Sequence, residues 1–198
     1  MTVNHRGLSR RLIHAAISLM VALTLLSGCT GLPRGLEVVS GFDARRYEGQ
    51  WFEIMRLDHR FERGLSQISA EYAILSDGSV RVINKGFDTR TCRWRAIEGR
   101  ARFLADPATA SLAVSFFGPF AGGYHVIELD RVDYQWAVVS GPTRGYLWIL
   151  ARTPALEPAT LERLVSRVRE LGFAAEELIR VEHGEPRCRV SDAPARAS

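Results

Sequence analysis

The chain has 198 residues, of which 46% are hydrophobic and 24% are charged, and its formal net charge at pH 7 is +4. This length is enough for one well-buried domain and gives no reason to expect two. The sequence contains neither a low-complexity segment nor an internal repeat.

Residues 1–28 have the pattern of a secretory signal peptide. Arg6, Arg10 and Arg11 form a basic start, and an apolar stretch runs from Leu12 to Leu26. This stretch is too short and too weakly flanked for a membrane span. Its removal leaves 170 of the 198 residues and takes away three of the 26 basic residues but none of the 22 acidic ones, so the charge falls from +4 to +1. Nucleic-acid binding loses its main support, and we predict no nucleic-acid partner.

The signal ends in Leu26-Ser27-Gly28-Cys29, which resembles the bacterial lipobox. The resemblance implies that the Cys29 thiol receives a diacylglyceryl group and that the chain is cut just before it. An ordinary signal with a chance cysteine is the alternative. Stable anchoring takes more than one acyl chain. The resemblance implies that palmitate is one of the chains on this cysteine. By analogy, Thr30 in place of an aspartate favours the outer membrane. We expect residues 29–40 to be the lipidated N-terminus and a tether.

Eight short strand-like runs follow, separated by turn residues. They are Gln50–Leu57, Ser66–Leu75, Val80–Phe87, Trp94–Phe103, Ser111–Phe116, Gly123–Leu129, Gln135–Ser140 and Gly145–Arg152. Strands at this close spacing predict a sandwich or a barrel.

The connections between these runs are of two kinds. Three are compact and polar: Ser76–Ser79, Ala105–Ala110 and Asp130–Tyr134. The alternate ones are richer in glycine, aromatic residues and arginine; they are Asp58–Gly64, Asp88–Cys92, Phe117–Gly123 and Gly141–Gly145. Alternate connections of an up-and-down antiparallel barrel lie at the same end, so the pattern predicts one closed end and one mouth.

One amphipathic helix follows the eighth run. Pro158 lies in its first turn, Gly172 ends it, and its apolar face carries Leu161, Leu164, Val165, Val168 and Leu171. This face needs an apolar partner, which we expect to be the outside of the barrel. A short final strand should follow at Leu178–His183.

Cys92 and Cys188 remain when Cys29 is set aside for lipidation. An even pair in an oxidising compartment predicts a disulfide, and two free thiols are the alternative. No spacing of histidine and cysteine suggests a zinc site, so we expect no metal.

Eight strands, a helix and a short strand resemble the order of elements in lipocalins. Gly49-Gln50-Trp51 resembles the lipocalin G-x-W motif, and Arg152 stands where lipocalins carry an arginine that packs across that tryptophan. The blocks FDARRYEGQWFEIMRLDHRFERGL, INKGF, VSFFGPFAGGYHVIELDR and YLWILARTP resemble the bacterial outer-membrane lipocalins, which are related to apolipoprotein D and plant temperature-induced lipocalins. We place the lipocalin domain at residues 41–184 and a tail at 185–198.

The resemblance implies a binding protein that needs no cofactor. It would hold a fatty acid or lysophospholipid in the barrel, for storage or transport in membrane maintenance. Its partners would be that lipid and, through the anchor, the membrane. A homodimer, in which a second copy of the protein contacts the rim, is an open alternative. Ala121 replaces a bulkier residue of the enterobacterial pattern, which bears on the width of the mouth.

An enzyme is the less favoured interpretation, and a structural envelope lipoprotein with a filled barrel is another alternative. His59, His125 and His183 belong to no recognisable triad motif. Both mature cysteines lie outside the expected cavity. The sequence therefore predicts no catalytic residues.

Strand alternation assigns side chains to the cavity. With Arg81 and Lys85 in water, Val82 and Asn84 turn inward, where Asn84 either holds a polar ligand group or pairs with a neighbouring strand. The expected inward side chains also include Tyr72, Phe116, His125 and Ile127 from parity, and Tyr146 and Trp148 from the resemblance. His125 is either a pH-dependent partner for a carboxylate or phosphate or a satisfied core group. Phe117 and Phe120 belong to the rim, and an inward Glu53 would need a partner.

Overall fold

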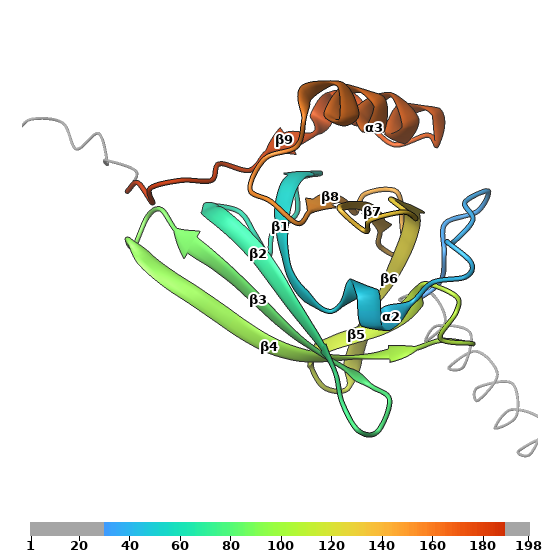
Figure 1. The fold of residues 1–198 in the computed structure, drawn as a ribbon. Coiled ribbons are helices and arrows are strands. Elements are labelled where there is room, and N and C mark those ends of the chain that lie inside the picture. Colours follow the sequence, from blue (N-terminus) through green and yellow to red (C-terminus); the bar gives the residue numbers. More distant parts are fainter. Residues whose placement is uncertain (1–29, 189–198) are drawn as a thin grey trace, which may run out of the picture.

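Figure 1 shows the chain in a computed structural model that describes residues 30–188. The expected signal peptide, the lipidation site Cys29 and the last ten residues of the expected tail lie outside the described residues. No helix within residues 30–188 has both the length and the apolar character needed to cross a membrane.

The strands form a closed, antiparallel, up-and-down barrel, as predicted. Each strand pairs with its neighbours in sequence, and β1 pairs with both β2 and β8, which closes the sheet. A short ninth strand pairs with the end of β1, beyond the part of β1 that pairs with β2. The strands are β1 (Gly49–Arg56), β2 (Leu65–Ile74), β3 (Val80–Asp88), β4 (Arg93–Phe103), β5 (Ser111–Phe117), β6 (Phe120–Leu129), β7 (Trp136–Ser140), β8 (Leu147–Ala151) and β9 (Ile179–Arg180).

Two apolar layers hold the barrel together. The inner layer fills the barrel with residues such as Trp51, Val82, Leu112 and Val139. The outer layer lies between the strands and α3 (Pro158–Glu170), which packs on the outside as Figure 1 shows. Leu161, Leu164 and Val168 are the buried face of α3, and the helix ends before Gly172, as the periodicity predicts. A short 3-10 turn, η1 (Ala175–Glu177), then leads into β9.

Two β-bulges break the side-chain alternation on which the sequence analysis relied. In β1 the register shifts between Glu53 and Met55, so Ile54 and Met55 both pack in the outer layer. In β6 the register shifts between Val126 and Glu128. A bulge places two successive residues on one face, and every residue beyond it changes sides relative to simple parity.

The compact polar connections lie at one end of the barrel and the alternate connections at the other, as expected, with one correction. The residues Phe117–Gly123 are not a long loop, because β5 continues to Phe117 and β6 starts at Phe120, with these two residues paired across a Gly118-Pro119 turn. Gly122 and Gly123 belong to β6 and pair with β5. The final strand is likewise shorter than the predicted Leu178–His183.

The segment before the barrel is packed against it, where the sequence suggested a tether. Leu36 and Val39 are buried, and the Val39 amide donates to the Val126 carbonyl at 2.9 Å. The Ala110 amide donates to the Val39 carbonyl at 3.0 Å. The helix α2 (Ala44–Tyr47), capped by the Asp43 carboxylate, then crosses the closed end and leads into β1. Packing on the barrel therefore begins before residue 41.

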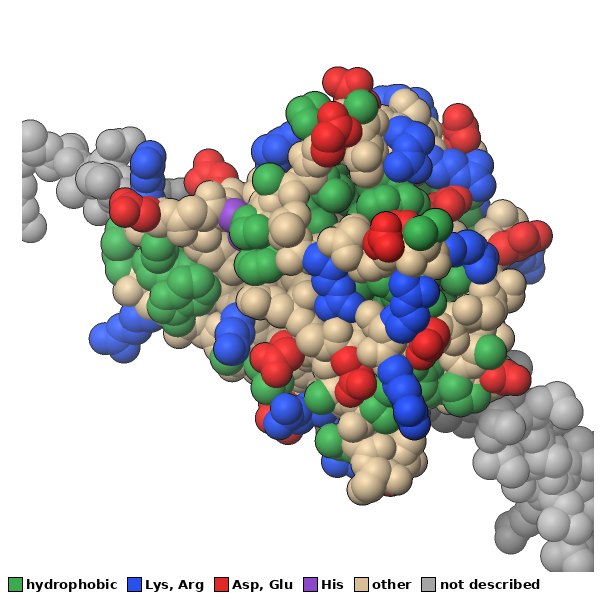
Figure 2. Space-filling view, viewed as in Figure 1, with side chains coloured by type: hydrophobic (Ala, Val, Ile, Leu, Met, Phe, Trp, Pro, Cys, Tyr) green, Lys and Arg blue, Asp and Glu red, His purple; other side chains and the backbone are tan. Residues whose placement is uncertain are grey.

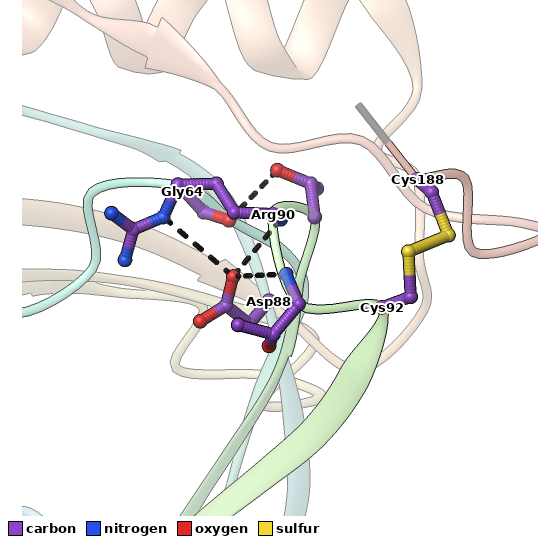
Figure 3. Close-up of a disulfide and its surroundings, with 7 residues drawn as sticks. Gly64, Asp88, Arg90, Cys92 and Cys188 are labelled. Carbon is purple, nitrogen blue, oxygen red and sulfur yellow. Dashed lines mark hydrogen bonds and ion pairs between the residues drawn. A yellow bond between two sulfur atoms is a disulfide. The ribbon is translucent and has the colours of Figure 1, made fainter. Parts of the chain in front are cut away.

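The disulfide between Cys92 and Cys188 is present and joins the β3–β4 connection to the C-terminal segment (Figure 3). Beside it, the buried Asp88 carboxylate accepts hydrogen bonds from the Arg90 and Thr91 amides and pairs with Arg95 at 2.6 Å. Burial would raise the pKa of Asp88, but these hydrogen bonds and the neighbouring arginine charges together lower it. The connection is thus fixed both covalently and electrostatically.

Candidate ligand-binding site

The closed end of the barrel is sealed by a tryptophan and an arginine. Trp51 is fully buried, and its indole N–H donates to the Tyr47 carbonyl at 2.9 Å. The Arg152 guanidinium lies 4.0 Å from the centre of the indole ring, as the resemblance implied. Arg152 also donates to the carbonyls of Glu48 and Gln50 at 2.8 and 3.0 Å, so it joins the start of β1 to the end of β8.

Three tyrosines form a floor above this seal. The Tyr124 hydroxyl is hydrogen-bonded to the hydroxyls of Tyr47 and Tyr72 at 2.8 and 2.9 Å. Burial raises the pKa of all three, so they stay protonated. The cavity beside them is about 20 Å³, which is room for about one water molecule. An acyl chain therefore has no space at this end of the barrel, which side chains fill.

Toward the open end, the inner face of the barrel becomes accessible. Val82 on β3 is buried, whereas Asn84, one step further along the same face, is half-buried. Its partner across the sheet on β2, Ala70, is also half-buried. Phe116 on β5 and Trp148 on β8 pack against the inner layer and are half-buried too. The inner wall is thus apolar, partly open and carries one amide.

The barrel wall is incomplete on one side of this region. β3 pairs with β4 from Val80 to Asp88, but within residues 30–188 β4 pairs with β5 only across Arg100–Phe103. The rest of β4 projects with β3 beyond the barrel, as seen in Figure 1. Phe116 lies against Gly99 where the two strands part, and a Cβ at Gly99 would lie 2.6 Å from its ring. The absence of a side chain at Gly99 therefore lets the phenylalanine turn into the barrel.

A buried charged cluster lies at the open end, and sequence reasoning found only one member of it. Arg56 Nε lies 3.3 Å from Glu53 and 3.4 Å from Glu62. His59 Nε2 lies 3.3 Å from the Glu62 carboxylate, and the Trp148 indole donates to the same group at 3.4 Å. The side chains of Glu53, Arg56 and His59 are about 5% exposed or less. This cluster supplies the partner that Glu53 requires.

The carboxyl groups of Glu53 and Glu62 outnumber the one guanidinium, that of Arg56, which lies between them. Burial raises the pKa of Glu53 strongly, the nearby Glu62 carboxylate raises it further, and the Arg56 charge opposes both. Both nitrogens of His59, one oxygen of Glu53 and Nε of Arg56 lack a hydrogen-bond partner of good geometry in the described chain. These atoms remain able to bond to a polar group that enters the barrel.

Two predicted cavity residues lie outside the barrel. The His125 Nε2–H donates to the Gly31 carbonyl at 3.1 Å, and the Ser111 hydroxyl donates to Nδ1 at 2.8 Å. Burial lowers the pKa of His125, in keeping with a neutral ring. Ile127 packs in the outer layer. The inward placement of both was wrong, because parity counted from Glu128 ignored the bulge between Val126 and Glu128.

The remaining predicted residues fall into two groups. Tyr72, Val82, Asn84, Phe116 and Trp148 share the inner face, and Tyr146 is half-buried in the β7–β8 connection with its ring stacked 6.3 Å from that of Trp148. Phe117 and Phe120 are 72% and 79% exposed at the tip of the β5–β6 hairpin, so they lie at the rim. No group of three or more potential metal ligands occurs among residues 30–188.

This up-and-down barrel, with a sealed closed end, an outer helix and an apolar interior open at the other end, defines a lipocalin. Residues 42–183 match the family of lipocalin-like domains, and the chain belongs to that family. It is 46% identical over 167 residues to the outer membrane lipoprotein Blc of Vibrio cholerae, covering 84% of this chain and 98% of that protein.

Further similarities agree with this membership. The chain is 49% identical over 150 residues to outer membrane lipoprotein Blc of Escherichia coli K12, covering 76% of this chain and 84% of that protein. It is 35% identical over 153 residues to temperature-induced lipocalin-1 of Arabidopsis thaliana, covering 72% and 80%. The fold is also that of insecticyanin from the tobacco hornworm Manduca sexta, with a TM-score of 0.64, 20% identity, and 82% and 92% coverage.

Proposed function

We propose that the protein binds a fatty acid or lysophospholipid, with the acyl chain in the open-end half of the barrel. The observation that carries this proposal is the increase in solvent exposure along the inner face. Val82 is buried, whereas Asn84, Phe116 and Trp148 are half-buried. Ligand sites of this kind are apolar and contain a few polar groups that fix orientation. Family membership supports a lipophilic ligand, and it favours a binding protein over an enzyme.

The polar end of the lipid would meet the charged cluster at the mouth. Glu53, Arg56 and His59 have buried polar atoms that lie near charged neighbours but form no hydrogen bond of good geometry within the described chain. A head group that forms hydrogen bonds there would supply the well-directed hydrogen bonds that these atoms lack, which is favourable. Asn84 is the second polar group within reach of this half of the barrel.

We also propose that the mature chain is an outer-membrane lipoprotein anchored through acyl chains on Cys29. The lipobox-like Leu26-Ser27-Gly28-Cys29 supports this, and so do the names of the Vibrio cholerae and Escherichia coli relatives. The role would be storage or transport of lipid in membrane maintenance.

A titration with lysophospholipid tests the binding proposal. The chain from residue 30 onward is followed by tryptophan fluorescence, because Trp148 lies on the inner wall. Asn84→Trp places a large ring on the inner face of β3 and should abolish saturable binding. Lys85→Trp places the same ring on the exposed outer face of the same strand and should leave binding unchanged.

Thermal melting of each protein with and without lipid distinguishes the outcomes. Saturable binding with a raised melting temperature, lost in Asn84→Trp and kept in Lys85→Trp, supports the proposal. If the unsubstituted chain shows neither, the barrel is filled and the protein is a structural lipoprotein. Release of free fatty acid during the titration would instead indicate an enzyme.

A further inference from the structure

The open end of the barrel exposes large aromatic side chains. Phe117 and Phe120 project from the β5–β6 hairpin, Phe61 from the β1–β2 connection and Trp94 from the start of β4, and each is more than half exposed. Exposed large apolar residues at the closed end are aliphatic, namely Leu104 and Val132. Exposed aromatic residues gathered at one end of a barrel indicate a surface that contacts an apolar partner.

The same end carries an excess of positive charge. Residues 57–64 and 88–95, which form two of its connections, contain five arginines and three acidic residues. Figure 2 shows hydrophobic side chains over the projecting β3–β4 hairpin, with basic side chains close by. Aromatic rings beside arginines are the combination that suits a membrane–water interface, where rings sit among head groups and cations meet lipid phosphates.

The N-terminal segment is docked beside one of these aromatic hairpins. The Gly31 carbonyl accepts the hydrogen bond from His125 on β6. Thr30 lies against Gly123, so closely that a Cβ at Gly123 would be 3.0 Å from the Thr30 carbonyl oxygen. Gly123 is three residues from Phe120 along β6. Cys29 is bonded directly to Thr30, so an acyl chain on Cys29 enters the bilayer within a few residues' reach of this hairpin.

We propose that the open end of the barrel faces the phospholipid bilayer, with Phe117 and Phe120 inserted in the leaflet that holds the acyl chains of Cys29. This inference rests on the proposed lipidation of Cys29 and adds an orientation to it. The hydrogen bond at His125 and the packing of Leu36 and Val39 keep the start of the chain on the barrel. The anchor therefore restrains how the barrel sits on the membrane, and the lipid site opens toward the leaflet.

Depth-dependent quenching tests the orientation in the full chain. The mature lipoprotein is reconstituted into vesicles of phosphatidylethanolamine and phosphatidylglycerol that contain phospholipid brominated along the acyl chain. Phe120→Trp reports on the open end. Val132→Trp, at an equally exposed position in the β6–β7 connection, reports on the closed end. The four native tryptophans give a background that both variants share.

We expect bromolipid to quench the added fluorescence of Phe120→Trp several-fold more than that of Val132→Trp. Equal quenching at both positions, or none at position 120 in protein that floats with the vesicles, would overturn the orientation while leaving the anchor intact. Protein that does not float, and whose mass shows no acyl chains, would overturn the anchor and this inference with it.

A second variant separates a membrane surface from a subunit interface. Phe117→Ser/Phe120→Ser should leave the particle mass unchanged when the lipoprotein is weighed in detergent by light scattering. If quenching at position 120 is absent and this double variant converts a dimer to a monomer, the hairpin binds a second copy and the inference is wrong. A melting temperature equal to that of the unsubstituted chain confirms that the double variant is folded.

Discussion

Arg56→Met should destabilise the barrel far more than the loss of an exposed arginine. Arg56 is the cation that contacts both Glu53 and Glu62, at 3.3 and 3.4 Å, and its side chain is 5% exposed. Methionine keeps the apolar stem and removes the charge. Two carboxyl groups are then left in the barrel without their guanidinium.

The expected magnitude follows from these distances. Two unit charges 3.3 Å apart attract by about 5 kcal/mol at an effective dielectric constant of about 20. Removing one partner of a buried pair typically costs about 3–5 kcal/mol. Because burial already raises the pKa of Glu53, this carboxyl can hold its proton when Arg56 is gone. We therefore expect the lower end of the range, about 3 kcal/mol of unfolding free energy at neutral pH.

Urea unfolding of the chain from residue 30 onward measures this loss. Arg167→Met is the matched control, because Arg167 is 46% exposed and contacts two carboxylates, Glu128 at 2.6 Å and Glu170 at 3.2 Å. Its loss should cost about 1 kcal/mol or less. The deficit of Arg56→Met should shrink as the pH is lowered and the buried carboxyls gain protons. An Arg56→Met protein as stable as the Arg167→Met control at neutral pH would refute this account of the cluster.

Two further predictions concern pH and the disulfide. The unfolded chain releases the Glu53 proton near its ordinary pKa of about 4.3, whereas the native state keeps it to higher pH, so native stability should fall as pH rises through this window. Glu53→Gln should flatten that slope in melting temperatures measured across the window; an unchanged slope would assign it to other groups. Cys92→Ser/Cys188→Ser opens a loop that spans 96 positions and should cost about 4–5 kcal/mol in urea unfolding, with faster amide exchange in residues 181–188. Unchanged exchange there would show that other contacts hold the segment.

Much of the fold follows from local sequence. The eight runs, the helix ending before Gly172 and the Cys92–Cys188 pair were all identified, because each depends on periodicity, turn residues or residue counting. The contact between Trp51 and Arg152 came from the family resemblance. None of these features requires knowledge of the register between paired strands.

The site was harder to predict because it depends on register. Simple parity placed His125 in the cavity, and a bulge in β6 reversed that assignment; another bulge in β1 puts Ile54 and Met55 in the same layer. A bulge is fixed by pairing with a strand far away in the sequence, so local alternation does not reveal it. The charged cluster did leave a signal, since Glu53 and Arg56 interrupt an otherwise mostly apolar run within β1.

Closure of the barrel through β1 and β8 has a consequence for the order in which the chain can fold. Phe52 pairs with Ala151, so the first strand lacks its second neighbour until almost the whole domain is available. Because synthesis starts at the N-terminus, β1 is made early and the edge that pairs with β8 stays unpaired until β8 has been made. Such long-range pairing slows folding and leaves an edge that other chains can add to. The edge of β1 that later pairs with β8 is therefore the place where such additions are most expected before the barrel closes.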